Sequence, residues 1–453
     1  MDAISIFSLA EHAGGTLSVD AGDTLVSGIS KDTRSLAEGD VYLALHGENF
    51  DGNEFVDDAV RRGAVAAIVD RNPIKPLPDN FPVIRVDNTL DALHRVAGWW
   101  RDELDLKVVG VTGSSGKTST KELTSAVLAV RYQVTKTQGN LNNHIGVPMT
   151  ILNASRSDQI AVWEMGMSQA GEIAPLAALA RPHIGIITNI GVAHIEFLKN
   201  REAIASEKAD LLRALDATGV AIIPDADDFA NYLADQTSAR VVRAGIGSGD
   251  VWAEDVALHA DGSTFSLQGC GSSCKARLTV PGEHMIKNAL LAVAAGVESG
   301  LSLEECAEGL AAARLTGGRL QQQDIRGIRI IDDTYNANPD SMDAALATLA
   351  SVAANGRAIA VLGKMGELGT YEKVGYQRVA TAAAKYAKIL ITVGEETAFL
   401  ARAARDAGCR DVSETRDPLE AARLLRTIAR PGDVVLIKGS RSARMEQVIG
   451  GFN

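Results

Sequence analysis

Residues 112 to 118 read Thr112-Gly113-Ser114-Ser115-Gly116-Lys117-Thr118. The apolar run Leu106 to Val111 before them is typical of a buried strand, and helical periodicity begins at Lys117. A glycine turn between a strand and a helix directs backbone N–H groups at an anion, while the lysine reaches terminal phosphates and the threonine hydroxyl can hold Mg²⁺. The stretch therefore predicts a phosphate-binding loop for ATP or GTP.

The loop departs from the usual spacing in one respect. The common pattern places a glycine five residues before the second glycine, where this chain has Val111, and Gly110 stands one position too early. We therefore expect a shortened loop. A helix-capping glycine turn is the alternative interpretation, and the strand before Gly116-Lys117-Thr118 favours the phosphate loop over it.

Composition limits the classes of protein to consider. The 453 residues suit about three domains, and 46% hydrophobic with 23% charged residues is typical of a soluble globular chain. A net charge of −12 argues against nonspecific binding to nucleic acid or to an anionic membrane. The sequence contains neither a basic signal-peptide start nor a long apolar run, so we expect a cytoplasmic protein without membrane insertion. The four cysteines are expected to be reduced thiols.

Strand-like and helical runs alternate along the chain, which predicts a doubly wound α/β architecture. We expect a small N-terminal α/β domain at residues 1–88, a central domain with the phosphate loop at 89–314, and a Rossmann-like C-terminal domain at 315–453. Thr316-Gly317-Gly318 is the expected hinge, and Trp99 and Trp100 are expected to pack in a core. The predicted strands after the first domain are Ile160 to Trp163, Ile184 to Ile187, Val220 to Ile223, Ile328 to Ile331, Ala358 to Leu362, Ile389 to Val393 and Val434 to Ile437.

Polar residues follow several of these strands, where ligands gather in such sheets. Glu164 and the Thr188-Asn189 pair come directly after two strands, and His194 follows closely. From the residues alone, Glu164 is either a metal ligand or a solvated strand end, and a lone histidine is more often structural. Lys208 lies on an amphipathic helix, where a surface lysine is the simpler interpretation. Asn288 could contact a nucleotide or simply belong to the polar face of a helix. Arg319 could contact a nucleotide phosphate or form an ion pair at the surface.

Taken together, motifs in the right order over nearly the whole chain resemble the Mur ligases, ATP-dependent amide-forming enzymes of bacterial cell-wall synthesis. Besides the phosphate loop, the resemblance rests on Gly139-Asn140-Leu141-Asn142-Asn143, Glu164-Met165-Gly166 with Gly171-Glu172-Ile173, Tyr335-Asn336-Ala337-Asn338-Pro339, and Lys438-Gly439-Ser440-Arg441. Within the family, these motifs are most similar to those of the member that adds D-alanyl-D-alanine to UDP-N-acetylmuramoyl-tripeptide. The resemblance implies these two small-molecule substrates, an acyl-phosphate intermediate and a monomeric enzyme.

The resemblance also implies roles for individual residues. Lys117, Glu164, His194 and Lys208 would be catalytic, and Thr118, Glu164, His194 and a carbamate on Lys208 would hold two Mg²⁺ ions. ATP would be bound by Gly113, Ser114, Ser115, Gly116, Lys117, Thr118, Asn288, Arg319, Asp333 and Asn336. The sugar nucleotide and peptide would be bound by Ser30, Asp32, Thr33, Arg34, Asn142 and Asn143, with the Gly47 to Phe55 stretch belonging to the same N-terminal signature.

Three positions differ from the family pattern. Asn53 stands where histidine is usual, Met285 replaces the asparagine after His284, and Lys364 stands where aspartate is common. Two other functions stay open. A related amide ligase, either the preceding amino-acid-adding Mur enzyme or a folylpolyglutamate synthase, would share the fold. A nucleotide-dependent switch would hydrolyse ATP without needing cell-wall substrates.

Overall fold

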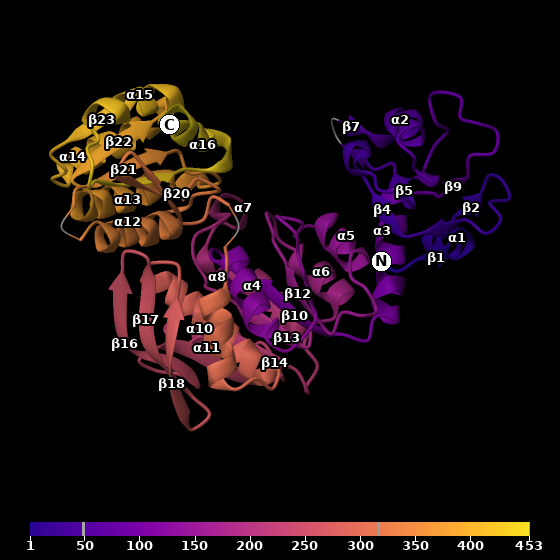
Figure 1. Cartoon of the computed structure of the whole chain (residues 1–453), viewed down its shortest axis with the longest axis horizontal. Helices are drawn as coiled ribbons and strands as arrows, with labels where there is room; N and C mark the ends of the chain where they lie inside the picture. Colours follow the sequence, from indigo (N-terminus) through magenta and orange to yellow (C-terminus); the bar gives the residue numbers. More distant parts are fainter. Residues whose placement is uncertain (48–49, 316, 355, 453) are drawn as a thin grey trace. The chain divides into compact units, whose positions relative to one another are not determined.

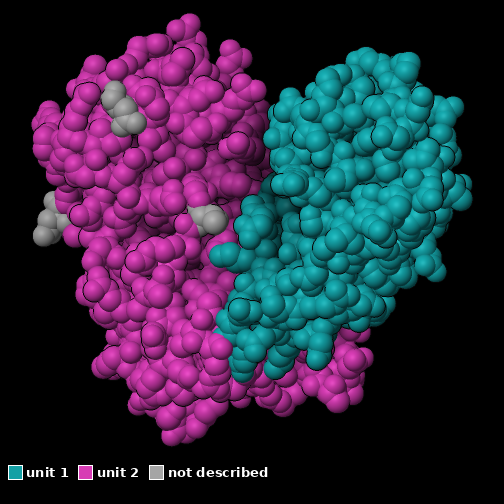
Figure 2. Space-filling model, turned by 45° about the vertical axis from the view of Figure 1, so that its right-hand side comes forward, with its two compact units in different colours: residues 1–108, 132–165, 175–182 teal, residues 109–131, 166–174, 183–453 magenta. Residues whose placement is uncertain are grey.

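The structure is a computed structural model that describes residues 1–47, 50–315, 317–354 and 356–452. Residues 48–49 of the Gly47 to Phe55 stretch, and Thr316 of the expected hinge, lie outside the described residues. The chain forms two compact units (Figure 2). The first comprises residues 1–108, 132–165 and 175–182, and the second comprises residues 109–131, 166–174 and 183–453.

The N-terminal part of the first unit is a small α/β module with the sheet order β2-β9-β8-β5-β4 (Figure 1). Strands β4, β5, β8 and β9 run parallel to one another, and β2 is antiparallel to β9. Its core includes Tyr42, Val56 and Val69. The elements are β1 (Ile4–Ser5), α1 (Ile6–Ala13), β2 (Thr16–Leu17), β3 (Leu25–Val26), β4 (Gly28–Ser30), β5 (Asp40–Leu43), β6 (His46–Gly47), β7 (Phe50–Asp51), α2 (Val56–Arg61), β8 (Ala66–Val69) and β9 (Val83–Arg85).

Helix α3 (Thr89–Glu103) follows this module and begins where the Asn88 side chain accepts hydrogen bonds from two backbone N–H groups of the first turn. Trp100 is fully buried and its indole N–H donates to the Ala154 carbonyl at 2.9 Å. Trp99 stacks on His12 at 4.1 Å and is only partly buried. Trp100 therefore packs in the core as expected, whereas Trp99 does so only in part. The unit continues with β11 (Val134–Lys136), α5 (Gly146–Leu152), β12 (Ile160–Glu164) and most of α6 (Ile173–Ala180).

The second unit contains a parallel series of strands in the order β10-β13-β14-β15, which confirms the predicted doubly wound α/β class. Strands β13 and β14 are nearly continuous apolar runs because helices cover them, whereas β15 includes Arg240 and Arg243. The elements are β10 (Lys107–Thr112), α4 (Lys117–Leu128), β13 (Ile184–Ile187), α7 (Ile195–Leu198), α8 (Arg201–Arg213), β14 (Val220–Pro224), α9 (Ala230–Ala234), β15 (Arg240–Ile246), α10 (Glu283–Glu298) and α11 (Leu303–Ala312).

An antiparallel extension continues this sheet through β16 (Val251–His259), β17 (Gly262–Gly269) and β18 (Ser272–Leu278). The sequence analysis did not predict these strands. Polar and charged residues interrupt all three strands, so they lack the long apolar runs of strands such as β13 and β14. Cys270 and Cys274 lie in the β17–β18 hairpin, and all four cysteines are free, as expected.

The last part of the second unit has the sheet order β19-β20-β24-β21-β22-β23. Antiparallel β19 pairs with β20, and the other strands are parallel. Helices α15 and α16 pack on one face, and α12 and α13 lie on the other (Figure 1). The elements are β19 (Gln321–Ile325), β20 (Ile328–Asp333), α12 (Pro339–Ala353), β21 (Ala358–Gly363), α13 (Glu372–Tyr386), β22 (Ile389–Val393), α14 (Ala398–Asp406), β23 (Val412–Thr415), α15 (Pro418–Ile428), β24 (Val434–Lys438) and α16 (Glu446–Phe452).

Candidate active site

The predicted phosphate loop joins the end of β10 to the start of α4 in the second unit. Gly113 and Gly116 have φ values of 153° and 77°, which L-residues with side chains rarely adopt. A Cβ atom at Gly113 would lie 1.8 Å from the Thr188 hydroxyl oxygen. The Lys117 ammonium donates to the Gly113 carbonyl at 2.8 Å and so folds back over the loop. The glycines therefore let the backbone come close to a phosphate group, and the N-terminus of α4 lies next to the loop, as in phosphate-binding sites.

The segment after β13 holds the loop in place. The Asn189 side chain accepts from the Ser115 N–H at 2.9 Å and donates to the Ser115 hydroxyl at 2.8 Å. Thr188 donates to the Ser115 carbonyl, and the Ser114 hydroxyl accepts from the Gly191 N–H at 2.9 Å. Strands β10 and β13 are parallel neighbours, so their carboxyl ends meet at one edge. The expected position of Thr188 and Asn189 at this edge is confirmed.

His194 has a backbone conformation that is rare for its residue type. Its φ is 63°, and its Nδ1 lies 2.5 Å from the Glu367 carboxylate. The hydrogen bond from His194 holds the pKa of Glu367 below its usual value. A left-handed non-glycine residue persists only where surrounding contacts impose it, and such residues concentrate at functional sites. Sequence reasoning missed Glu367, because 173 positions separate it from His194 in the printed sequence.

Lys208 is buried in the middle of α8, with only 1% of its surface exposed. The interpretation of this residue as a surface lysine is therefore wrong. Burial lowers the pKa of Lys208 well below its usual value, the Lys117 charge lowers the pKa further, and Glu207 opposes the shift. A lysine reacts with CO₂ to form a carbamate only as the neutral amine, so this environment fits the modification that the resemblance implies.

Glu207, the neighbour of Lys208, is a buried carboxylate that sequence reasoning did not single out. It accepts hydrogen bonds from the backbone N–H groups of Gly171, Glu172 and Ile173 at 2.7, 2.8 and 2.9 Å. These donors lie at the start of α6, where the helix dipole favours a negative charge. The contacts fix the position of α8, and with it Lys208. The sequence offered no signal for this role, because the adjacent Lys208 was itself interpreted as a surface residue.

Two of the predicted nucleotide contacts meet at the phosphate loop. Asn288 lies on α10 with its side-chain oxygen 2.7 Å from where a Cβ of Gly116 would stand. The Arg319 guanidinium donates to the Thr118 hydroxyl at 2.9 Å and lies 4.1 Å above the Tyr335 ring. The cation–π contact orients the arginine toward the loop.

Asp333 and Asn336 form a separate group around Lys438. The buried Lys438 ammonium donates to the Asp333 carboxylate at 2.6 Å and to the Asn336 carbonyl at 2.9 Å. The Asn336 side chain is exposed and accepts from the Ala337 N–H. His284 is largely buried nearby, and burial lowers its pKa to about 4, with Asp333 opposing and Lys438 favouring the shift.

In the first unit, Glu164 is a buried carboxylate at the end of β12 and not a solvated strand end. The Asn142 side chain donates to Glu164 at 2.8 Å, and the Glu164 N–H donates to the Thr137 hydroxyl at 2.9 Å. The Asn143 side-chain oxygen accepts from the N–H groups of Ile145 and Gly146, where α5 begins. Asn142 therefore orients Glu164, while the oxygen of Asn143 is used locally.

The predicted sugar-nucleotide residues form a compact turn at the end of β4. Asp32 and Arg34 pair through two hydrogen bonds at 2.9 and 2.6 Å, which hold the pKa of Asp32 well below its usual value. The Ser30 hydroxyl donates to the Asp32 carbonyl, and Thr33 hydrogen-bonds Asp58 and lowers its pKa.

Asn53, the departure from the usual histidine of this N-terminal signature, is buried. Its side chain donates to Asp51 at 2.8 Å and to Asp70 at 3.1 Å. Asn53 thus supplies a neutral donor to two carboxylates at this position.

Among the described residues, no group of three His, Cys, Asp or Glu residues could hold a metal ion. The predicted set of Thr118, Glu164, His194 and Lys208 differs from such a group because a hydroxyl and a carbamate supply part of the oxygen donors, which suit Mg²⁺. Thr118, His194 and Lys208 belong to the second unit and Glu164 to the first. In the part of the chain that the structure describes, no helix has the length and apolarity to cross a membrane.

Comparisons with known proteins match this architecture along its length. Residues 25–100 match the model of the Mur ligase family catalytic domain, 111–296 the Mur ligase middle domain, and 318–441 the Mur ligase glutamate ligase domain. A curated UDP-N-acetylmuramoyl-tripeptide–D-alanyl-D-alanine ligase of Bacillus subtilis is 37% identical over 98% of this chain and 97% of its own length. The Escherichia coli protein of the same name is 34% identical over 99% and 98%.

Solved structures give the same result. A MurF crystal structure from Acinetobacter baumannii superposes with a TM-score of 0.90 at 33% identity, over 100% of this chain and 99% of its own. A Thermotoga maritima MurF ligase in complex with ADP superposes with a TM-score of 0.82 at 29% identity, over 94% and 96%. The family-model matches and the full-length identities agree with the loop, the buried lysine and the three sheets described above. The chain belongs to the Mur ligase family.

Proposed function

We propose that the chain joins D-alanyl-D-alanine to UDP-N-acetylmuramoyl-tripeptide in an ATP-dependent ligation. Full-length relatives that carry this name, at 34 to 37% identity, are the observation that carries the assignment. The phosphate loop at Gly113–Thr118 and the buried Lys208 support it from the structure. Folylpolyglutamate synthase and diaminopimelate ligase structures match at 17% and 18% identity, a likeness that extends to the fold alone.

The reaction takes place in two steps. A terminal carboxylate of the tripeptide attacks the γ-phosphorus of ATP, the bond between that phosphorus and the bridging oxygen breaks, and ADP leaves. The amine of the dipeptide then attacks the acyl carbon, the acyl C–O bond breaks, phosphate leaves, and the nitrogen loses a proton. Phosphorylation is needed because a carboxylate resists attack by an amine, and the phosphate supplies a leaving group.

The chain's own groups support the first step by holding phosphate oxygens. In this proposal Lys117 and the N–H groups at the start of α4 hold the terminal phosphates, and Arg319 adds a guanidinium beside Thr118. Asn288, Asp333 and Asn336 serve the rest of the nucleotide in this proposal. The ADP complex of the Thermotoga maritima relative is consistent with ATP as the nucleotide.

Thr118, Glu164, His194 and a carbamate on Lys208 are the proposed holders of two Mg²⁺ ions. Bound Mg²⁺ neutralises charge on the phosphate oxygens and on the reacting carboxylate. Glu367 orients His194, and Asn142 orients Glu164, so both proposed ligands have a fixed neighbour. Ser30, Asp32, Thr33 and Arg34 are the proposed contacts of the uridine diphosphate sugar, with Asn142 and Asn143 on the peptide side.

The domain boundaries at residues 1–88, 89–314 and 315–453 stay part of the proposal, supported by three family models that follow one another in this order. A monomeric state, a cytoplasmic location and the absence of nucleic-acid binding also stay predictions from the sequence.

A coupled assay of ADP release, with each substrate omitted in turn, tests the function. We expect ADP release only with both the tripeptide nucleotide and the dipeptide, and a product whose mass equals the sum of the two substrates minus water. ADP release at the same rate without the dipeptide would instead identify an ATPase or a nucleotide-dependent switch.

A further inference from the structure

The segment that links β13 to His194 is fixed at three successive backbone N–H groups by three different parts of the second unit. Ile190 donates to Asp227 at 2.9 Å, Gly191 donates to the Ser114 hydroxyl at 2.9 Å, and Val192 donates to Asp340 at 2.8 Å. Asp227 follows β14 and Ser114 belongs to the phosphate loop. Asp340 comes from the C-terminal region, where it is the second residue of α12.

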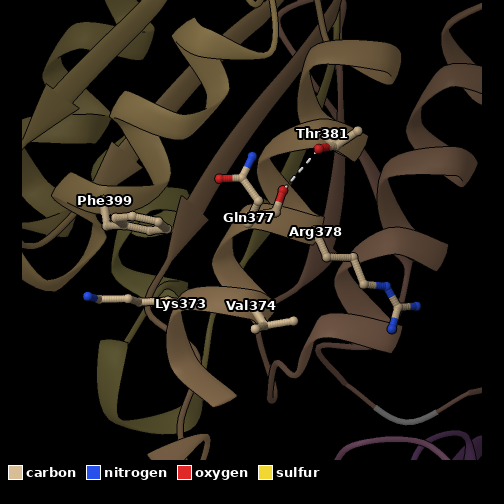
Figure 3. A pocket seen from close by; sticks show the side chains of 6 residues that line it. All are labelled: Lys373, Val374, Gln377, Arg378, Thr381 and Phe399. Carbon is tan, nitrogen blue, oxygen red and sulfur yellow. Dashed lines mark hydrogen bonds between the residues drawn. The ribbon is translucent and has the colours of Figure 1, made fainter. Parts of the chain in front are cut away.

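Asp340 is itself held by an arginine. One carboxylate oxygen accepts from Val192, and the other accepts from the Arg378 guanidinium at 2.8 Å. Arg378 lies on α13 at the edge of a surface hollow, and its guanidinium points away from Phe399 on the other side of that hollow (Figure 3). The same guanidinium also pairs with Asp343, one turn further along α12. Hydrogen bonds that involve a carboxylate are shorter and stronger than neutral ones.

The identity of residue 191 fits this contact. A Cβ atom at Gly191 would lie 2.1 Å from the Asp340 carboxylate oxygen and 3.3 Å from the Cβ of Ser114. Gly191 is not among the residues with positive φ, so the backbone conformation does not require glycine here. Glycine is required because the carboxylate and the phosphate-loop serine both pack against its α-carbon.

We propose that Asp340 is a positioning residue for the ligation, through which the C-terminal region fixes residues 190–194 against the phosphate loop. Gly191 contacts the loop and Val192 contacts Asp340, so a displaced carboxylate shifts Ser114 on one side and His194 on the other. Displacements of about 1 Å near reacting groups can cost up to about 100-fold in rate. The catalytic consequence rests on the proposed function, whereas the positioning itself does not.

Asp340→Ala and Asp343→Ala form a matched pair, because both remove a carboxylate partner of Arg378 from the same helix. Among the described residues, only Asp340 of the two also contacts residues 190–194. For Asp340→Ala we expect kcat to fall about tenfold while KM for ATP changes less than about threefold, since the groups that hold the phosphates remain. For Asp343→Ala we expect kcat within about twofold of the wild type.

Hydrogen–deuterium exchange of a peptide spanning residues 188–198 provides a readout that does not need activity. Asp340→Ala should speed exchange of this peptide about tenfold, and Asp343→Ala should leave it unchanged. Asp340→Asn, which keeps an acceptor oxygen, should restore most of the protection. Equal exchange and equal kcat in the two alanine variants would overturn the proposal. A wild-type protein that forms no product would contradict the proposed function, while the exchange comparison would still test the positioning.

Gly191→Ala provides a second test. Its added methyl group collides with Asp340, so the substitution should cost more kcat in the wild-type background than in Asp340→Ala. Additive effects of the two substitutions would show that Gly191 and Asp340 act independently and would count against the proposal.

Discussion

The phosphate loop is predicted to bind ATP and the Ser30–Arg34 turn is predicted to bind the sugar nucleotide, yet the two are held in opposite ways. The loop is fixed by partners far away in the sequence, with Asn189 at 74 residues from Ser115 and Arg319 at 201 residues from Thr118. The turn is fixed mostly by itself, through Asp32 and Arg34 two residues apart. Ser114 is 4% exposed, whereas the Arg34 side chain is 81% exposed. The comparison teaches that distant parts of the second unit preorganise the phosphate loop, whereas the turn can readjust to a ligand.

Lys117→Ala should give the largest effect, because it removes a charge from the preorganised loop. We expect kcat to fall by about 1,000-fold or more, with the unfolding midpoint close to that of the wild type. An assay of ADP release measures kcat, and thermal unfolding measures the unfolding midpoint. Lys287→Ala, which removes an exposed side chain of α10, is the control, with wild-type rates expected. A Lys117→Ala enzyme with more than a tenth of wild-type activity would show that the loop does not bind the transferred phosphate.

Lys208→Ala should cost about 100-fold in kcat, because it removes the amine on which the proposed carbamate oxygens for Mg²⁺ would form. The expected signature is partial rescue by small carboxylates such as acetate or formate, which supply the oxygens of a carbamate. Full activity of Lys208→Ala without added bicarbonate would contradict the carbamate. Mass spectrometry of the intact protein under CO₂ would show a gain of one CO₂ in the wild type and none in the variant.

The pH dependence of the free energy of unfolding should report the burial of His284. Burial lowers its pKa from 6.5 to about 4, so as pH falls through this window the unfolded chain gains a proton that the folded chain does not bind. The contribution of His284 to the free energy of unfolding is therefore fully present above about pH 6.5 and is lost toward pH 4. At pH 4.5 the loss is about 2 kcal/mol. Urea unfolding of wild type and His284→Gln at pH 7 and pH 4.5 measures the loss. An equal decrease in both proteins would show that other groups cause it.

Arg34→Ala should give the smallest effect, because the turn is exposed and held locally. We expect KM for the uridine nucleotide precursor to rise about tenfold, with kcat and the unfolding midpoint nearly unchanged. Steady-state kinetics with varied precursor measures this. Arg62→Ala is the control, because Arg62 is an exposed arginine that follows directly after α2 and pairs with Asp58. A large decrease in the unfolding midpoint of Arg34→Ala would contradict the local character of the turn.

The sequence predicted the parallel strands well because their signal is local. The predicted runs Ile184 to Ile187 and Ile389 to Val393 coincide with β13 and β22, and the other predicted runs differ from their strands by one or two residues at an end. The parallel strands β11, β15 and β23 were not predicted. A strand buried on both faces is a continuous apolar run, and the phosphate loop combines glycines and lysine within seven residues. Both patterns can be recognised without knowing which strands are neighbours.

The contacts that complete the candidate site could not be predicted in this way. Glu367 and Asp340 are ordinary acidic residues in the sequence, and only the packing of the C-terminal region brings them to His194 and Val192. Amphipathic periodicity made Lys208 resemble a surface residue, because the pattern indicates which helix face is apolar but not whether the other face is also covered. The antiparallel strands β16 to β18 were missed because polar and charged residues interrupt their apolar pattern.

The antiparallel extension ends at β18, which leaves one strand edge without a further partner strand among the described residues. Such an edge can recruit strands of other molecules, and charged side chains are the usual protection. Lys275 and Arg277 of β18 are 80% and 60% exposed in their side chains and pair with Asp255 and Asp261. Replacing both with valine would remove this protection without touching a nucleotide contact, and the first consequence would be self-association in concentrated solution, with the rate per active site preserved.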